Sequence, residues 1–176
     1  MIDLSRMLLI PALVLISSAS VAAAGTFEEA LVAYDEAIAS REVDHEGYAT
    51  AYAIWKDLAA DDHDGAQYHL GMLHWFGLGG AEQDQSRALI LIQDSARAGY
   101  PTAQAFLGFL YENGVELVLD RDQITALKFY YAAAQSGQCV AVRRMEQAFT
   151  DGGLGIEPDP AAAAEWRARL PECRKR

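Results

Sequence analysis

The acidic cluster Asp61-Asp62-His63-Asp64 is the first place in this sequence where residue types could bind a metal ion. Carboxylate oxygens are ligands of Ca²⁺, and an imidazole favours a transition metal. The cluster stands at a predicted turn between helices, where acidic residues stabilise the following helix dipole, and no second cluster lies at ligand spacing. His69 and His74 are about 140° apart around a helix, so they cannot chelate one ion together. We therefore predict no metal site and no cofactor.

Motifs of catalysis are also missing from the sequence. It contains no Gly-x-Ser-x-Gly elbow, no His-Glu-x-x-His, no Cys-x-x-Cys and no P-loop. The glycine-rich segments 77–80 and 152–155 resemble phosphate cradles, but no Lys-Ser or Lys-Thr follows, and glycine there supplies the backbone angles of a turn. We predict a protein without enzyme activity and without catalytic residues. An enzyme stays open as the alternative, because folding can assemble a site that sequence does not reveal.

The N-terminal 24 residues have the three-part pattern of a secretory signal. Arg6 precedes an apolar stretch at 7–16, and small residues lead to Ala22-Ala23-Ala24. We predict a signal peptide over 1–24, cleavage after Ala24, and a periplasmic or secreted mature chain. The apolar stretch is shorter than the roughly 20 residues of a membrane span, so we expect no stable membrane insertion after cleavage; an uncleaved anchor is the alternative.

Charge and cysteine content agree with an exported protein that binds no nucleic acid. The net charge of −11 repels phosphate. Cys139 and Cys173 are the only cysteines, and two cysteines in an exported chain favour one disulfide. Cys139 begins a predicted helix and Cys173 follows its antiparallel partner, so both lie at the same end of one hairpin. Free thiols are the alternative.

The chain beyond the signal repeats itself. Similar segments begin at Ala66, Ala103 and Ala141, which are 37 and 38 residues apart. Glycine, aspartate and alanine recur in the same register: Gly77, Gly114 and Gly152; Asp84, Asp122 and Asp159; Ala88, Ala126 and Ala163. A period of this length is typical of helical pairs that stack into a solenoid, because one pair cannot bury its apolar face alone.

Each repeat is predicted to contain two helices joined by a glycine-containing loop. The first helix ends at a glycine such as Gly77, and an aspartate such as Asp84 caps the second. Upstream, Thr26 and Glu29 form a capping box that opens a further helical pair. We predict four hairpins, eight helices and no strand of any length; the segment 115–119 is the only β-like run.

The second repeat is similar almost throughout to the Sel1-like repeat, a longer relative of the tetratricopeptide repeat. The matching residues are Ala103, Leu107-Gly108, Tyr111, Gly114, Asp122, Ala126, Tyr130, Ala133-Ala134 and Gly137. The resemblance implies an all-α, right-handed α-solenoid, with a tetratricopeptide-like hairpin at 25–62 and Sel1-like repeats at 63–99, 100–137 and 138–173. It also implies a non-catalytic adaptor or regulator that acts through protein–protein contacts in the cell envelope, and it favours the periplasm.

Aromatic and methionine side chains that the repeat does not require predict the binding surface. They are Tyr68, His69, Met72, Trp75, Phe106 and Phe109, on the first helices that line the concave face. The register places Phe106 beside His69 and Phe109 beside Met72. Such residues form interface hot spots, and the groove would fit a peptide or a partner helix. The alternatives are that several of them pack between hairpins, and that the protein is a cell-wall-directed hydrolase or a carbohydrate-binding protein.

Overall fold

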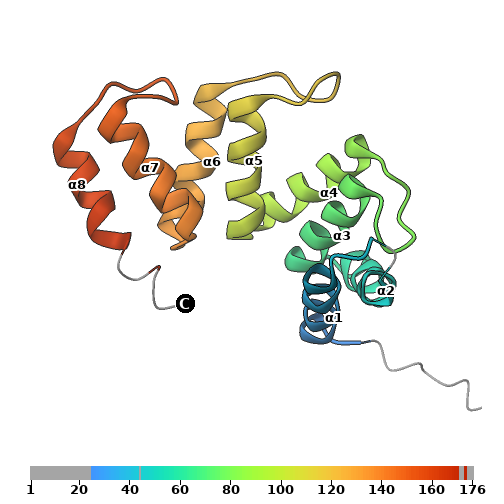
Figure 1. The fold of residues 1–176 in the computed structure, drawn as a ribbon. Helices are drawn as coiled ribbons and strands as arrows, with labels where there is room; N and C mark the ends of the chain where they lie inside the picture. Colours follow the sequence, from blue (N-terminus) through green and yellow to red (C-terminus); the bar gives the residue numbers. More distant parts are fainter. Residues whose placement is uncertain (1–24, 44, 171–172, 174–176) are drawn as a thin grey trace, which may run out of the picture.

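The computed structural model describes residues 25–43, 45–170 and 173, which form an arched stack of helices (Figure 1). The predicted signal peptide at 1–24 and the basic residues at 174–176 lie outside the described residues. Among the helices that the structure describes, none is both long and apolar enough to cross a membrane.

The described chain folds into eight helices that follow one another as four antiparallel pairs. They are α1 (Phe27–Ser40), α2 (Glu46–Ala60), α3 (Asp64–Phe76), α4 (Gln85–Ala98), α5 (Pro101–Asn113), α6 (Gln123–Gln135), α7 (Cys139–Asp151) and α8 (Pro160–Arg169). β-structure in the described residues is limited to two isolated bridges, Val115 with Leu119 and Gly153 with Ile156. The predicted all-α solenoid is confirmed.

Local sequence signals explain where the helices begin and end. The Thr26 side chain accepts a hydrogen bond from the Glu29 backbone while the Glu29 carboxylate accepts one from Thr26, which completes the predicted capping box. Asp84 caps α4 because its side chain accepts a hydrogen bond from the Arg87 amide. Gly77 ends α3 with a positive φ of 70°, a conformation that glycine adopts without the steric penalty of a side chain.

Packing is local, as a solenoid requires: each helix lies mainly against its neighbours in the sequence. Within a pair, a glycine lets the helices approach closely. A Cβ on Gly108 would lie 2.9 Å from the Tyr130 ring, so α5 and α6 touch there through backbone and ring. The third repeat has Glu146 at this position, and its carboxylate instead accepts hydrogen bonds from Arg167 on α8.

The core forms three consecutive clusters of buried side chains. The first cluster surrounds Trp55 and joins α1, α2 and α3. The second contains Ile92 and Leu107 and joins α3, α4 and α5. The third contains Met145 and Trp166 and has residues from all four helices α5 to α8. Residues from adjacent helical pairs share each cluster, so the pairs stabilise one another.

Candidate interaction surface on the first helices

The six side chains predicted to form the binding surface lie on two adjacent first helices, four on α3 and two on α5. Tyr68 is only 8% exposed and belongs to the core between these helices, so it packs between repeats as the alternative interpretation holds. Phe109 is 52% exposed, and Phe76 at the end of α3 is 54% exposed. Trp75 and Phe106 are half-buried. Water therefore reaches part of this aromatic set.

Ring contacts join α3 and α5 into one aromatic row. The ring centroids of Trp75 and Phe106 lie 5.7 Å apart in an edge-to-face arrangement, and Phe106 lies 6.2 Å from Tyr68. Phe109 continues the row at 6.3 Å from Phe106. These separations are those of favourable aromatic pairs. Each ring of the row thus packs against another ring, while Phe109 stays more than half exposed and open to a partner.

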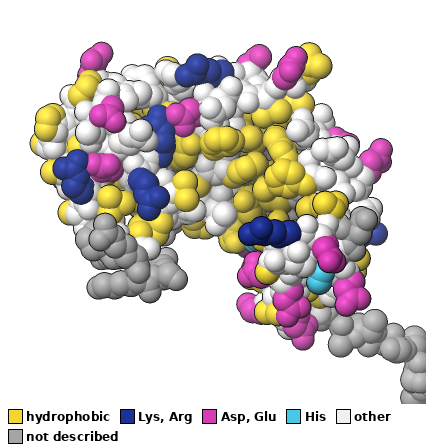
Figure 2. All heavy atoms as spheres, in the orientation of Figure 1, with side chains coloured by type: hydrophobic (Ala, Val, Ile, Leu, Met, Phe, Trp, Pro, Cys, Tyr) yellow, Lys and Arg dark blue, Asp and Glu magenta, His cyan; other side chains and the backbone are white. Residues whose placement is uncertain are grey.

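A cavity of about 250 Å³ lies at one end of this row, where α3, α5 and the start of α7 meet. Its lining is mostly apolar: Tyr68, Thr102, Ala105, Phe106, Phe109, Tyr130, Gln138 and Val140. We call this cavity the first-helix groove. Val140, which lines the groove, is 62% exposed. Figure 2 shows a broad apolar area across the middle of the molecule, over the helices of the central repeats.

Val140, Tyr130 and Gln138 were not among the predicted binding residues. Val140 stands in register with Thr102, and both line the first-helix groove, but neither residue type marks a binding surface in the sequence. The contribution of Tyr130 from α6 carried no signal, because a tyrosine there is part of the repeat pattern. Only the crossing of α5 and α6 brings its ring to the groove.

His69 turns away from this groove and packs toward the N-terminal pair. Its ring stacks on Trp55 with centroids 4.5 Å apart and also contacts Phe27 and Tyr34. The predicted neighbour, Phe106, instead contacts Tyr68 and Trp75. Burial among these rings lowers the pKa of His69 to about 4, so the imidazole is neutral at pH 7. His69 thus joins two repeats rather than presenting a charge to a ligand.

An ion pair fixes the α5, α6 and α7 side of the groove. Arg144 donates to both Glu112 carboxylate oxygens, at 2.6 and 3.1 Å, and the Tyr130 hydroxyl donates to one of them at 3.0 Å. Burial raises the pKa of Glu112, but the hydrogen bonds from Arg144 and Tyr130 outweigh it and leave the pKa below its usual value. The carboxylate therefore stays ionised and paired, which holds the Tyr130 ring in place.

The acidic cluster at 61–64 acts as a helix start. The His63 Nδ1 atom accepts a hydrogen bond from the Ala66 amide, and the Asp64 carboxylate accepts one from Gly65. The His63 ring also stacks on Phe27 at 4.7 Å. Within the described ranges no three His, Cys, Asp or Glu side chains come together as metal ligands would.

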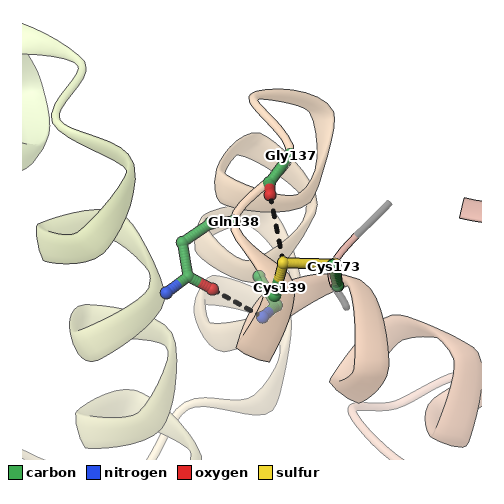
Figure 3. The surroundings of a disulfide bond; sticks show 5 residues. Gly137, Gln138, Cys139 and Cys173 are labelled. Carbon is green, nitrogen blue, oxygen red and sulfur yellow. Dashed lines mark hydrogen bonds between the residues drawn. A yellow bond between two sulfur atoms is a disulfide. The ribbon is translucent and has the colours of Figure 1, made fainter. Parts of the chain in front are cut away.

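The predicted disulfide is present. Cys139 at the start of α7 is bonded to Cys173 beyond α8, with Cα atoms 5.4 Å apart, a normal separation for a disulfide (Figure 3). Gln138 caps α7 by accepting a hydrogen bond from the Ala141 amide. The bond therefore closes the open end of the last helical pair, as the positions of the two cysteines in the repeat predicted.

A comparison with known families accounts for the period of the sequence repeats. The model of the family described as "Sel1 repeat" matches residues 65–100, 101–138 and 149–166. The chain belongs to the Sel1 repeat family. The third match covers only part of the predicted third repeat, where Glu146 replaces the glycine of the others. Sel1 repeats are typically non-catalytic scaffolds that mediate contacts between proteins.

Among curated proteins, the chain is 35% identical over 88 residues to the chitin synthase regulator SKT5 of Saccharomyces cerevisiae. The match covers 48% of this chain but only 12% of that protein. The chain thus spans only a small part of the length of that protein.

Two solved structures share the fold. A Sel1 repeat protein from Oxalobacter formigenes has a TM-score of 0.62 and 28% identity, over 68% of this chain and 86% of that one. The protective antigen c5321 of uropathogenic Escherichia coli, which displays an SLR fold, has a TM-score of 0.64 and 22% identity, over 85% of this chain and 31% of that one. The second likeness concerns the fold alone.

Proposed function

We propose that this Sel1 repeat protein is exported and acts in the cell envelope as a non-catalytic adaptor or regulator that binds a protein partner in the first-helix groove. The observation that carries this proposal is the row of rings from Trp75 to Phe109. It ends at an apolar cavity and leaves Phe109 more than half exposed. A soluble surface rarely exposes so much connected apolar area without a partner.

The groove has the size and chemistry of a receptor for one or two side chains. Its volume of about 250 Å³ is small for a substrate-sized ligand. Its lining is mostly apolar, and its polar groups are the Tyr68 and Thr102 hydroxyls, the Gln138 amide and the Tyr130 hydroxyl, which donates to Glu112. An aliphatic or aromatic anchor from a peptide or helix would bury itself there, as hot-spot residues do.

Export and regulation are supported by separate observations. The disulfide between Cys139 and Cys173 is the kind of bond that persists in oxidising compartments, which agrees with the predicted signal peptide at 1–24. The chitin synthase regulator that shares part of the repeat sequence acts, by its name, on an enzyme rather than as one. By analogy, we propose that this protein regulates the partner that it binds.

In-cell cross-linking followed by mass spectrometry tests the proposal. The tagged protein, its Phe109→Ala variant and an Ile90→Ala control are compared; Ile90 is a similarly exposed apolar residue on α4, at 58%. We expect one protein to be cross-linked to the wild type and the control, and at least tenfold less to Phe109→Ala. Equal recovery by all three would exclude the groove.

Two further measurements separate the other parts of the proposal. N-terminal sequencing of the protein recovered from the envelope fraction is expected to begin at Gly25. Co-sedimentation with insoluble chitin and peptidoglycan tests the carbohydrate-binding alternative, because exposed rings also stack on sugars. Phe109-dependent sedimentation, without a cross-linked protein, would replace the protein partner by a polysaccharide.

A further inference from the structure

Charge is distributed unevenly along the solenoid. Residues 25–62, which form α1 and α2, have ten acidic and two basic side chains, whereas residues 138–176 have six acidic and seven basic ones. Acidic side chains accordingly gather over α1 and α2 at the lower right of Figure 2, and several basic ones lie over α7 and α8. The lining of the first-helix groove extends from Tyr68 on α3 to Gln138 and Val140, which begin the second of these regions.

Asp64, at the start of α3 just beyond the acidic region, acts on an aromatic side chain near the groove. Burial raises the pKa of the Tyr100 hydroxyl, a hydrogen bond with Thr102 lowers it in part, and the Asp64 carboxylate raises it. The ring centroids of Tyr100 and Tyr68 are 5.6 Å apart, and Tyr68 lines the groove. On α1, the pKa of the Tyr34 hydroxyl is raised by burial first, then by Tyr48 and by Asp35. Acidic side chains, and not basic ones, therefore act on these two tyrosines on the N-terminal side of the groove.

The groove itself carries no net charge. None of its lining residues is charged, and the nearby Glu112, which the Tyr130 hydroxyl contacts, is neutralised by Arg144. A charged side chain placed in the groove would lose hydration without gaining an opposite partner, whereas an apolar one would gain contact with Phe106 and Phe109. The groove therefore favours an apolar anchor side chain. The acidic side chains on its N-terminal side determine which charges are favourable next to that anchor.

We infer that the partner of this protein presents an apolar anchor residue flanked on one side by Lys or Arg, and that these cations lie over the acidic α1 and α2 pair while the anchor fills the first-helix groove. This inference rests on the proposed function, because it names the partner of the same surface. The charge gradient also fixes the direction of the bound segment: its cationic flank points toward the N-terminal end of the solenoid.

Selection from a random peptide library displayed on phage tests the chemistry without knowledge of the natural partner. The purified protein is the bait. Peptides enriched on it are expected to contain one Leu, Phe, Ile or Trp with two or more Lys or Arg on one side, and to be depleted in Asp and Glu. Free synthetic versions of the enriched peptides then give dissociation constants by fluorescence anisotropy.

Four variants assign the two parts of the recognition. Phe109→Ala should weaken binding at least tenfold, whereas the exposed control Ile90→Ala should leave it unchanged. The double variant Asp35→Asn with Asp64→Asn should weaken binding about fivefold at low salt and remove most of its salt dependence. The matched double variant Asp120→Asn with Glu157→Gln neutralises two exposed acids in the loops after α5 and α7 and should have no effect. Circular dichroism checks that each variant remains folded.

The outcomes separate this inference from the proposed function. If enriched peptides require Phe109 but are neutral or acidic, or bind equally to the Asp35 and Asp64 variant, the cationic flank is wrong and the groove stands. If no peptide is enriched, or binding ignores Phe109, the groove and the inference both fall. Sedimentation velocity of the protein alone tests whether a second copy of this chain occupies the groove. A dimer that Phe109→Ala abolishes would show that the second copy is the partner.

Discussion

The two ends of this solenoid are stabilised by different interactions. At the N-terminal end, the junction of α1, α2 and α3 is filled by stacked rings around Trp55 and His69. At the C-terminal end, α7 and α8 are joined by a disulfide and by the pair of Glu146 with Arg167, in addition to an apolar core around Met145 and Trp166. The repeat register is the same at both ends, yet only the C-terminal end adds a covalent link to its apolar core.

This difference shows how a repeat chain terminates. An internal pair has neighbours on both sides, whereas α8 has only α7 and α6 to bury its apolar side chains. The disulfide adds stability at this end by restricting the unfolded chain. The N-terminal pair instead depends on the packing of the rings around Trp55.

The largest effect is expected from Trp55→Ala. Trp55 is fully buried and contacts Phe27, Tyr34 and His69, so its removal leaves a cavity at the junction of three helices. We expect a loss of about 3–5 kcal/mol in the free energy of unfolding, measured by urea denaturation. Phe76→Ala, at an exposed ring on α3, is the control and should cost less than about 1 kcal/mol. Equal losses would mean that the N-terminal end does not depend on its ring packing.

Reduction of the disulfide is expected to have the next largest effect. The bond closes a loop of 34 residues, for which the chain-entropy model gives about 3–4 kcal/mol. Hydrogen exchange should accelerate in α7 and α8 on reduction while the amides of α3 remain protected, because repeats unfold from their ends. Cys139→Ser with Cys173→Ser should reproduce the reduced protein and should not respond to reductant. Uniform acceleration along the chain would contradict local stabilisation.

A pH dependence should distinguish the N-terminal end. The folded pKa of His69, about 4, lies below its unfolded value of 6.5, so the unfolded chain binds more protons between these values. Stability from the neutral ring is complete above pH 6.5 and is lost as the pH falls toward 4. The surrounding titratable groups are the Tyr34, Tyr68 and Tyr100 hydroxyls, which stay neutral in this range.

We expect the free energy of unfolding to fall by about 2 kcal/mol between pH 7 and pH 5 in the wild type, less in His69→Phe. Urea denaturation at both pH values measures the difference. Since His69→Phe keeps a ring at this position, it removes the titration with little change in packing. Identical pH profiles for the two proteins would show that His69 is not the group that titrates.

The smallest effect is expected from Glu146→Gln. The Arg167 side chain that pairs with Glu146 is 60% exposed, and such pairs contribute about 0.2–1 kcal/mol. Thermal unfolding of the oxidised protein should change by no more than a few degrees, and the change should shrink at high salt. A loss of stability as large as that caused by reducing the disulfide would contradict the expected order of these two effects.

The repeat register was readable from the sequence because its signals are local. Asp84 begins α4 and Gly77 ends α3 through the conformations of a few neighbouring residues, so single positions predict the helix ends. The pairing of Cys139 with Cys173 follows from the same register. The binding surface was only partly readable, because residue type shows that a ring is present but not which way it points.

His69 and Tyr68 illustrate what depended on tertiary structure. Both are aromatic side chains on the first helix of one repeat, yet Tyr68 closes the core against α5, and His69 stacks on Trp55 from α2. Val140 entered the groove without being aromatic at all. The sequence by itself determined the repeat, the eight helices and the disulfide, since these rest on local backbone preferences and on a fixed period. Only the packing of one repeat on the next decided which rings are buried and where a cavity is left, because that depends on side-chain shapes at contacts between distant residues.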